Sequence, residues 1–285
     1  NIFEKVACQG LKEGMRKGTQ ILFTNLAGYD EKAHYFGPMS PEAFEMLKSI
    51  DEKIGQIVNE SDKNKKKYDV VIFSDHGQTP SRLFYDVYGE DIRKTVDKFA
   101  KAAAESAGNT HKEGDVVFAD AYSLGNIYFN FDKKHVDLSE IEKRYPGMTE
   151  NLKNHPGIGL VCGTENGHYI IKGKEGSVDI APDGSRIVTG QDPLIPYGDT
   201  KIVGEQIVNY LNVRMCGDIV IFGVYDPNAD CVIDFNKKYS LRSLHGGLGG
   251  DQTEPFIISS PGLRIDGSKI TEASQLHDIF EEYNK

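Results

Sequence analysis

Two apolar runs of strand length each end in a cluster of acidic and histidine residues, and this order constrains the fold most. Ile21–Leu26 leads to Gly28-Tyr29-Asp30, and Tyr68–Phe73 leads to Ser74-Asp75-His76-Gly77. Between the runs, Ser40 and Pro41 are suited to begin a helix. Apolar residues then recur at helical spacing: Phe44, Leu47, Ile50, Ile54 and Ile57. A strand–helix–strand order predicts a parallel α/β sheet, whose ligand sites lie where the strands end.

The pattern changes between residues 115 and 199, where short strand-like runs alternate with Gly, Asn and Pro turns. These runs are Val116–Ala119, Gly125–Phe131, Gly159–Cys162, Tyr169–Lys172 and Val178–Ala181. We expect one long helix at Leu83–Ala107, a helix at Thr200–Arg214 and a final helix at Thr271–Tyr283. The sequence therefore predicts an α/β core in two parts, 1–114 and 200–285, with a mainly antiparallel β-rich insertion or subdomain at 115–199.

The composition is that of a water-soluble globular protein without a nucleic-acid-binding surface. Hydrophobic residues make up 39% of the 285 residues, and the net charge is −10. The basic cluster Lys63–Lys67 is expected to be a solvated loop. Because the sequence begins at Asn1 without a methionine or a signal-peptide pattern, we expect it to be part of a longer polypeptide. Its compartment does not follow from these residues, and a membrane anchor or an extracytoplasmic location of the longer protein stays open.

The cysteines and several histidines are expected to have structural or solvent-facing roles. The four cysteines are scattered without CxxC spacing and are expected to be small buried residues: Cys8, Cys162, Cys216 and Cys231. Five histidines lie beside Lys, Pro, Gly or helix-surface residues and are expected to pack or face solvent: His111, His135, His155, His168 and His277.

Five other residues form a candidate metal-ligand set. Asp30 and His34 are four positions apart, so one helical face can present both to one ion. Asp75 and His76 are adjacent at the end of a strand, and His245 precedes a glycine-rich loop that we expect to be flexible. Each pair alone is more often surface polarity, a cap or a turn. Together they form a mixed nitrogen and oxygen set that zinc accepts, as do manganese and iron.

The same residues resemble the type I phosphodiesterase/nucleotide pyrophosphatase family of the alkaline phosphatase superfamily. The matching blocks are Asp30-x-x-x-His34-x-x-Gly37-Pro38 and Ser74-Asp75-His76-Gly77, and His245 resembles the family's final metal-binding histidine. The resemblance implies a mainly parallel sheet flanked by helices and two divalent ions, zinc or alternatively manganese. Asp30, His34 and His245 would hold one ion, and Asp75 and His76 the other. The implied substrate is a small phosphate ester or a nucleotide.

The sequence departs from this family at the nucleophile. The resemblance places a Thr or Ser nucleophile and a further metal-binding Asp upstream of Asp30. The first 29 residues contain no Asp, and their only Ser or Thr residues are Thr19 and Thr24, neither at a strand-to-helix turn. We therefore expect a nucleophile upstream of Asn1, in the N-terminal part of the same protein, and little or no activity from this chain alone.

Three other functions stay open. A sulfatase or a phosphomutase of the same superfamily would share the metal ligands, and a non-catalytic metal-binding domain would need no nucleophile. The substrate, the natural metal and the oligomeric state do not follow from these residues.

Overall fold

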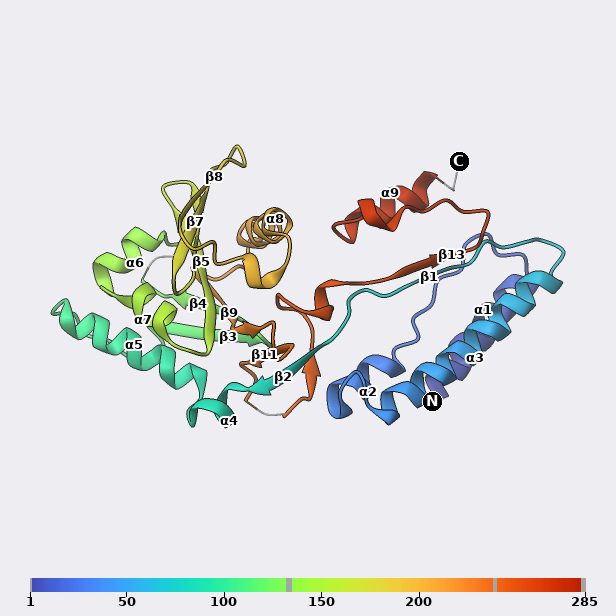
Figure 1. Cartoon of the computed structure of the whole chain (residues 1–285), viewed down its shortest axis with the longest axis horizontal. Coiled ribbons are helices and arrows are strands. Elements are labelled where there is room, and N and C mark those ends of the chain that lie inside the picture. The colour runs from blue at the N-terminus through green and yellow to red at the C-terminus, as the bar shows by residue number, and fades with distance from the viewer. Residues whose placement is uncertain (1, 132–134, 238–239, 283–285) are drawn as a thin grey trace. The chain divides into compact units, whose positions relative to one another are not determined.

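The computed structural model describes residues 2–131, 135–237 and 240–282, which form two compact units (Figure 1). Unit 1 combines Asn1–Gln78 with Glu254–Lys285, and unit 2 is Thr79–Thr253. The described helices include none that is long and apolar enough to span a membrane.

Unit 1 is mainly helical. Its helices are α1 (Ile2–Arg16), α2 (Gly28–Phe36), α3 (Pro41–Lys63) and α9 (Ser274–Glu282), with a 3-10 turn at η3 (Gly267–Lys269). The expected start of α3 is confirmed, because Ser40 Oγ accepts a hydrogen bond from Ala43 N at 3.1 Å. Helices α1 and α3 lie side by side (Figure 1), with Cys8, Met15 and Ile57 buried in a small core.

The strands of unit 1 are short and antiparallel. β1 (Val71–Phe73) pairs with β13 (Ile257–Ser259), which confirms the second half of the strand expected at Tyr68–Phe73. The strand expected at Ile21–Leu26 is wrong. This segment has no regular secondary structure, and Ile21 and Phe23 are 64% and 79% exposed. A strand needs a hydrogen-bonded partner, and the described part of the chain supplies none to this segment.

A seven-stranded antiparallel sheet organises unit 2, in the order β3-β4-β9-β5-β6-β7-β8. Its strands are β3 (Val116–Ala121), β4 (Leu124–Phe129), β5 (Ile158–Glu165), β6 (His168–Lys172), β7 (Gly176–Ile180), β8 (Arg186–Gly190) and β9 (Ile219–Gly223). The antiparallel strands expected between 115 and 199 are confirmed. Because β9 pairs between β4 and β5, this region shares one sheet with residues beyond 199. The two compact units meet at 78/79 and 253/254 in the sequence. The expected division of the chain into 1–114, 115–199 and 200–285 stays a prediction.

A second sheet of unit 2 contains β10 (Tyr225–Asp226), β11 (Cys231–Asp234), β2 (Thr79–Leu83) and β12 (Ser243–Leu244). Of the strand pairs in the described ranges, only β2 with β11 is parallel. The α/β class is confirmed, because the described residues form both helices and sheets. The described strands pair mainly antiparallel, whereas a mainly parallel sheet was expected. The neighbouring strands β3–β4, β5–β6 and β6–β7 are joined by short turns, which can connect only antiparallel strands.

Helices cover both faces of the larger sheet. The helices of unit 2 are α4 (Phe84–Tyr88), α5 (Ile92–Ser106), α6 (Leu138–Arg144), α7 (Met148–Asn154) and α8 (Thr200–Leu211), with 3-10 turns η1 (Ile195–Tyr197) and η2 (Asp251–Thr253). Side chains of α4 to α7 share one buried core with Ile219 and Ile221 of β9, and α8 shares another with Val220 and Phe222 (Figure 1). This alternation explains why β9 is apolar throughout.

The single helix expected at Leu83–Ala107 is wrong. Gly89 has a left-handed φ of 75° and ends α4, and the Asp91 carboxylate accepts a hydrogen bond from Arg93 N at 3.0 Å to begin α5. Glycine is favoured at the end of a helix because it adopts positive φ without strain. The sequence Gly89-Glu90-Asp91 carries both signals.

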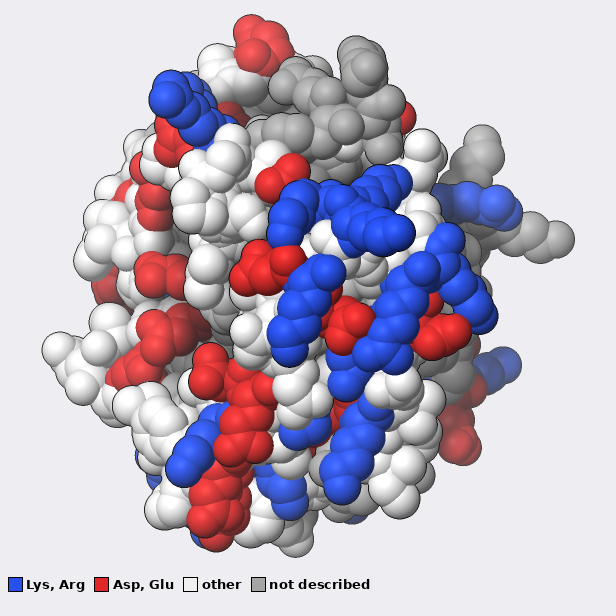
Figure 2. Space-filling view, turned by 90° about the vertical axis from the view of Figure 1, so that its right-hand side faces the viewer, with Lys and Arg blue, Asp and Glu red and all other residues white. Residues whose placement is uncertain are grey.

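Charged side chains are mixed on the face drawn in Figure 2, where acidic residues intersperse with basic ones. Within unit 1, Arg16 forms a two-pronged ion pair with Glu60, with Nε to Oε1 at 2.8 Å and Nη2 to Oε2 at 3.0 Å. Lys65, Lys66 and Lys67 are exposed, which confirms their expected solvation.

Candidate metal site

Asp30 and His34 lie on one face of α2 in unit 1. Asp30 is in the first turn of this helix rather than in a loop after a strand. His34 Nε2 lies 3.4 Å from Asp30 Oδ1, as the i, i+4 spacing predicts. The His34 side chain is only 10% exposed, whereas that of Asp30 is 42% exposed. The histidine is thus fixed by packing, and the carboxylate retains access to solvent.

Asp75 and His76 follow β1 in the same unit. The preceding residue, Ser74, is tied to Phe256 twice: Ser74 N donates to Phe256 O at 3.1 Å, and Ser74 Oγ accepts from Phe256 N at 3.0 Å. His76 Nε2 lies 3.5 Å from Asp75 Oδ2, and His76 Nδ1 lies 2.9 Å from Gly77 O. Because a carbonyl only accepts, this contact requires a proton on His76 Nδ1.

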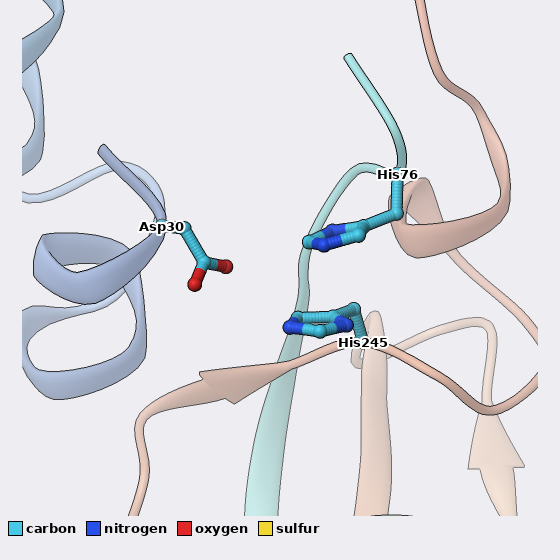
Figure 3. A group of neighbouring side chains, drawn as sticks. All are labelled: Asp30, His76 and His245. Carbon is cyan, nitrogen blue, oxygen red and sulfur yellow. The ribbon is translucent and has the colours of Figure 1, made fainter. Parts of the chain in front are cut away.

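Asp30 and His76 converge within unit 1. A carboxylate oxygen of Asp30 and a ring nitrogen of His76 lie within 4.8 Å of each other, and the carboxylate points toward the imidazole (Figure 3). Asp30 therefore faces both His34 and His76, although the family resemblance assigns these histidines to different ions. The arrangement brings together one member of each ligand pair of unit 1, Asp30 and His76, whereas the Asp75 side chain is 80% exposed. The ion that each residue holds stays a prediction.

Gln78 is a residue at this site that the sequence analysis did not identify. Its side chain is 6% exposed, and Nε2 donates to Asp30 Oδ1 at 2.5 Å and to Asp30 O at 3.2 Å. The carboxamide therefore fixes the Asp30 carboxylate. Its only signal in the sequence is its position directly after Ser74-Asp75-His76-Gly77.

His245 belongs to unit 2, where it directly follows β12. Its ring lies 5.5 Å from that of Tyr122, centroid to centroid. Buried polar side chains contact the backbone of the glycine loop that follows His245. Gln252 Oε1 accepts from Gly247 N at 3.0 Å, while Gln252 Nε2 and Thr79 Oγ1 donate to Gly249 O at 2.8 and 3.0 Å. Gln252 and Thr79 are both buried, so the loop backbone is held by internal hydrogen bonds.

The other histidines and the cysteines have structural environments. His168 pairs with Asp179 at 2.7 Å, and His111 pairs with Asp97 at 2.9 Å. His155 stacks on Phe84 with ring centroids 5.0 Å apart, and burial lowers the pKa of its imidazole. Cys8, Cys162 and Cys216 are buried free thiols, as expected, and Cys231 is a half-buried free thiol.

The donors in unit 1 fit a divalent transition metal. Carboxylate and neutral imidazole are both zinc ligands, with bonds of about 2.0–2.2 Å, so two donors on one ion lie at most about 4 Å apart. The separation of up to 4.8 Å between Asp30 and His76 is close to that limit.

Comparison with known proteins adds three findings. Residues 3–178, more than half of the chain, match the family described as type I phosphodiesterase/nucleotide pyrophosphatase. No protein of curated description matches the chain. Among solved structures, the chain is similar to an inactive form of the murine ectonucleotide pyrophosphatase/phosphodiesterase 5 in complex with AMP, at 16% identity and a TM-score of 0.42. That match covers 81% of this chain and 44% of the murine chain, so this sequence spans less than half the length of that protein.

Proposed function

Because the chain belongs to the type I phosphodiesterase/nucleotide pyrophosphatase family, we propose that it is the metal-binding part of a phosphoric ester hydrolase. Its substrate is a small phosphodiester or a nucleotide. The observation that carries this proposal is the convergence of acidic and imidazole side chains in unit 1. Asp30 lies 3.4 Å from His34 and within 4.8 Å of His76.

The proposed ligand set divides between two ions. Asp30, His34 and His245 hold one, and Asp75 and His76 hold the other. The ions are zinc, with manganese as the alternative, and when bound they supply positive charge that stabilises a phosphoryl group in its transition state. Asp30 and Asp75 offset part of the metal charge. In this proposal His76 binds its ion through Nε2, because Nδ1 donates its proton to Gly77 O.

The nucleophile of this proposal lies outside the 285 residues, in another part of the same polypeptide. Unit 1 has a surface suited to such a partner segment, because many of its large apolar side chains are exposed. These include Ile21, Phe23, Phe44, Leu47 and Ile258, which are 45% to 79% exposed. Burying such a surface favours association. In this proposal a strand of the partner segment pairs with residues 21–26, which have no regular secondary structure here.

Zinc titration by calorimetry tests the ligand assignment. The site with three protein ligands should give one tight binding event, and the site with two should bind more weakly. His245→Ala and Asp30→Asn should each abolish the tight event. His168→Gln is the matched control, because it alters another Asp–His pair, 2.7 Å apart, and should leave the titration unchanged. Two equally tight events would contradict this ranking, and tight binding that survives both variants would refute the site.

A non-catalytic metal-binding role is the second candidate. It is favoured by the first 29 residues, which contain no Asp and no Ser or Thr other than Thr19 and Thr24. The two candidates predict different results for the longer polypeptide. If it is a hydrolase, it should cleave a phosphodiester. If it is a binding protein, it should bind zinc without turnover. Preferential cleavage of a sulfate ester would instead favour the sulfatase alternative.

A further inference from the structure

The turn between β3 and β4 contains an aromatic residue in an unfavourable backbone conformation. Ala121 and Leu124 form the last pair of the hairpin, so Tyr122 and Ser123 are the two loop residues. Tyr122 has a φ of 58°. The first central residue of such a turn requires positive φ and is normally glycine, because a Cβ atom is strained there.

Tyr122 stands out even among the residues that share this conformation. The other non-glycine residues with positive φ in the described ranges are Asn166 and Asp230. Asn and Asp tolerate this region, whereas bulky residues rarely enter it. A strained residue persists where its surroundings fix it and its side chain has a use.

The backbone of this turn is fixed on both sides. Tyr122 O accepts from Phe235 N at 2.8 Å, and Ser123 O accepts from Gly223 N at 2.7 Å. Phe235 and Ser123 are each 1% exposed. These two bonds join backbone atoms only, so the tyrosine ring makes neither of them. The turn geometry alone does not explain why residue 122 is a tyrosine.

The turn packs directly against the loop that follows His245. A Cβ atom added to Gly247 would lie 1.8 Å from Ser123 Oγ, so the two segments are in close contact. The Tyr122 ring lies 5.5 Å from the His245 ring at an angle of 55°, and both side chains are half-buried. Gln252 and Thr79 fix the loop backbone through Gly247 and Gly249, but they do not fix the side-chain torsions of His245.

We propose that Tyr122 is a positioning residue for His245, whose imidazole it holds in the orientation needed to bind a divalent metal. This inference rests on the proposed function, because it takes His245 as a ligand. The aromatic contact restricts the imidazole before the metal binds, which lowers the conformational entropy lost on binding. Residues that orient a metal ligand typically change metal affinity by about 10–100-fold.

The test uses three substitutions of Tyr122 in the whole chain. Tyr122→Phe keeps the ring and should leave the zinc dissociation constant unchanged. Tyr122→Leu removes the ring and Tyr122→Gly also relaxes the turn, and each should weaken zinc binding about tenfold. Asn166→Gly is the matched control, because it relaxes another turn residue with positive φ at a hairpin remote in sequence from His245, and should have no effect.

Two further readouts separate positioning from a structural role. Urea unfolding should show that Tyr122→Gly is no less stable than Tyr122→Leu, because glycine suits this turn, even though both lose affinity. In metal-free protein, the ring-proton resonances of His245, assigned by their loss in His245→Gln, should shift in Tyr122→Leu but not in Tyr122→Phe. Unchanged zinc affinity in Tyr122→Leu, while His245→Ala abolishes tight binding, would overturn this inference alone. Unchanged affinity in His245→Ala would overturn the proposed ligand set itself.

Discussion

The buried carboxamide of Gln78 donates a hydrogen bond to the carboxylate of Asp30, with Nε2 2.5 Å from Oδ1. A second bond, from the same nitrogen to Asp30 O, fixes the first turn of α2 against the segment that contains Asp75 and His76. Gln78 thus connects two candidate ligand segments of unit 1 that are 45 residues apart in sequence, from Asp30 to Asp75.

Gln78→Leu is expected to weaken zinc binding by about 10-fold or more, because the Asp30 carboxylate loses the donor that orients it. Leucine is close in volume, so the cavity effect is small. The loss of two hydrogen bonds should also lower the free energy of unfolding by about 1–3 kcal/mol. Calorimetric titration and urea unfolding measure the two effects. A variant that loses stability but binds zinc like the native chain would show that Gln78 is only structural.

Gly247→Ala is expected to destabilise unit 2, because the new Cβ atom would lie 1.8 Å from Ser123 Oγ. Overpacking of this kind typically costs about 1–3 kcal/mol. Ser123→Ala removes the clashing oxygen, which has no hydrogen-bond partner among the described residues. The double variant should therefore recover part of the loss. Urea unfolding of the four proteins of this cycle measures the coupling, and strictly additive effects would contradict the packing described for these residues.

Stability should decrease as the pH falls below the ordinary pKa of histidine, and His155 contributes to this decrease. Burial lowers the pKa of His155 in the folded chain, so the unfolded chain binds the proton more strongly. Between the folded pKa and the unfolded value of about 6.5, the free energy of unfolding thus falls with falling pH. Urea unfolding at several pH values from about 5 to 8 should give a shallower decrease for His155→Gln. The exposed His277→Gln is the control and should follow the native chain.

Local signals in the sequence predicted much of the fold, and nonlocal pairing explains most of what they missed. The Ser40 cap depends on residues that are adjacent in sequence, and it was predicted correctly. Ile21–Leu26 has the composition of a buried strand, but whether it pairs depends on a partner that the described residues do not contain. The antiparallel pairing of β1 with β13 likewise joins residues 71 and 259, which no local pattern reports.

At the candidate site too, local contacts were predictable from the sequence and nonlocal contacts were not. The helical spacing of Asp30 and His34 predicted their contact, because both residues lie in one helix. Only the family resemblance and the expected sheet edge indicated that His76 would lie near Asp30. In the structure Asp30 lies in the first turn of α2, whereas the sequence had placed it in a loop after a strand. Gln78 was not predicted, since glutamine carries no metal-ligand signal and its role depends on a contact across 48 positions.

Hydrolytic activity is expected to require the longer polypeptide. The 285-residue chain should cleave a chromogenic phosphodiester such as bis-nitrophenyl phosphate at least about a thousandfold more slowly than the longer protein, because an enzyme without its nucleophile keeps only residual activity. With zinc or manganese, the longer protein should be active, and His34→Ala or Asp75→Ala should abolish turnover. His168→Gln should preserve it. Initial rates at equal protein concentration make the comparison. If the short chain is as fast as the longer one, the nucleophile lies within it. Thr24→Ala is then the first variant to examine, since Thr24 is a half-buried hydroxyl residue in the segment that precedes α2.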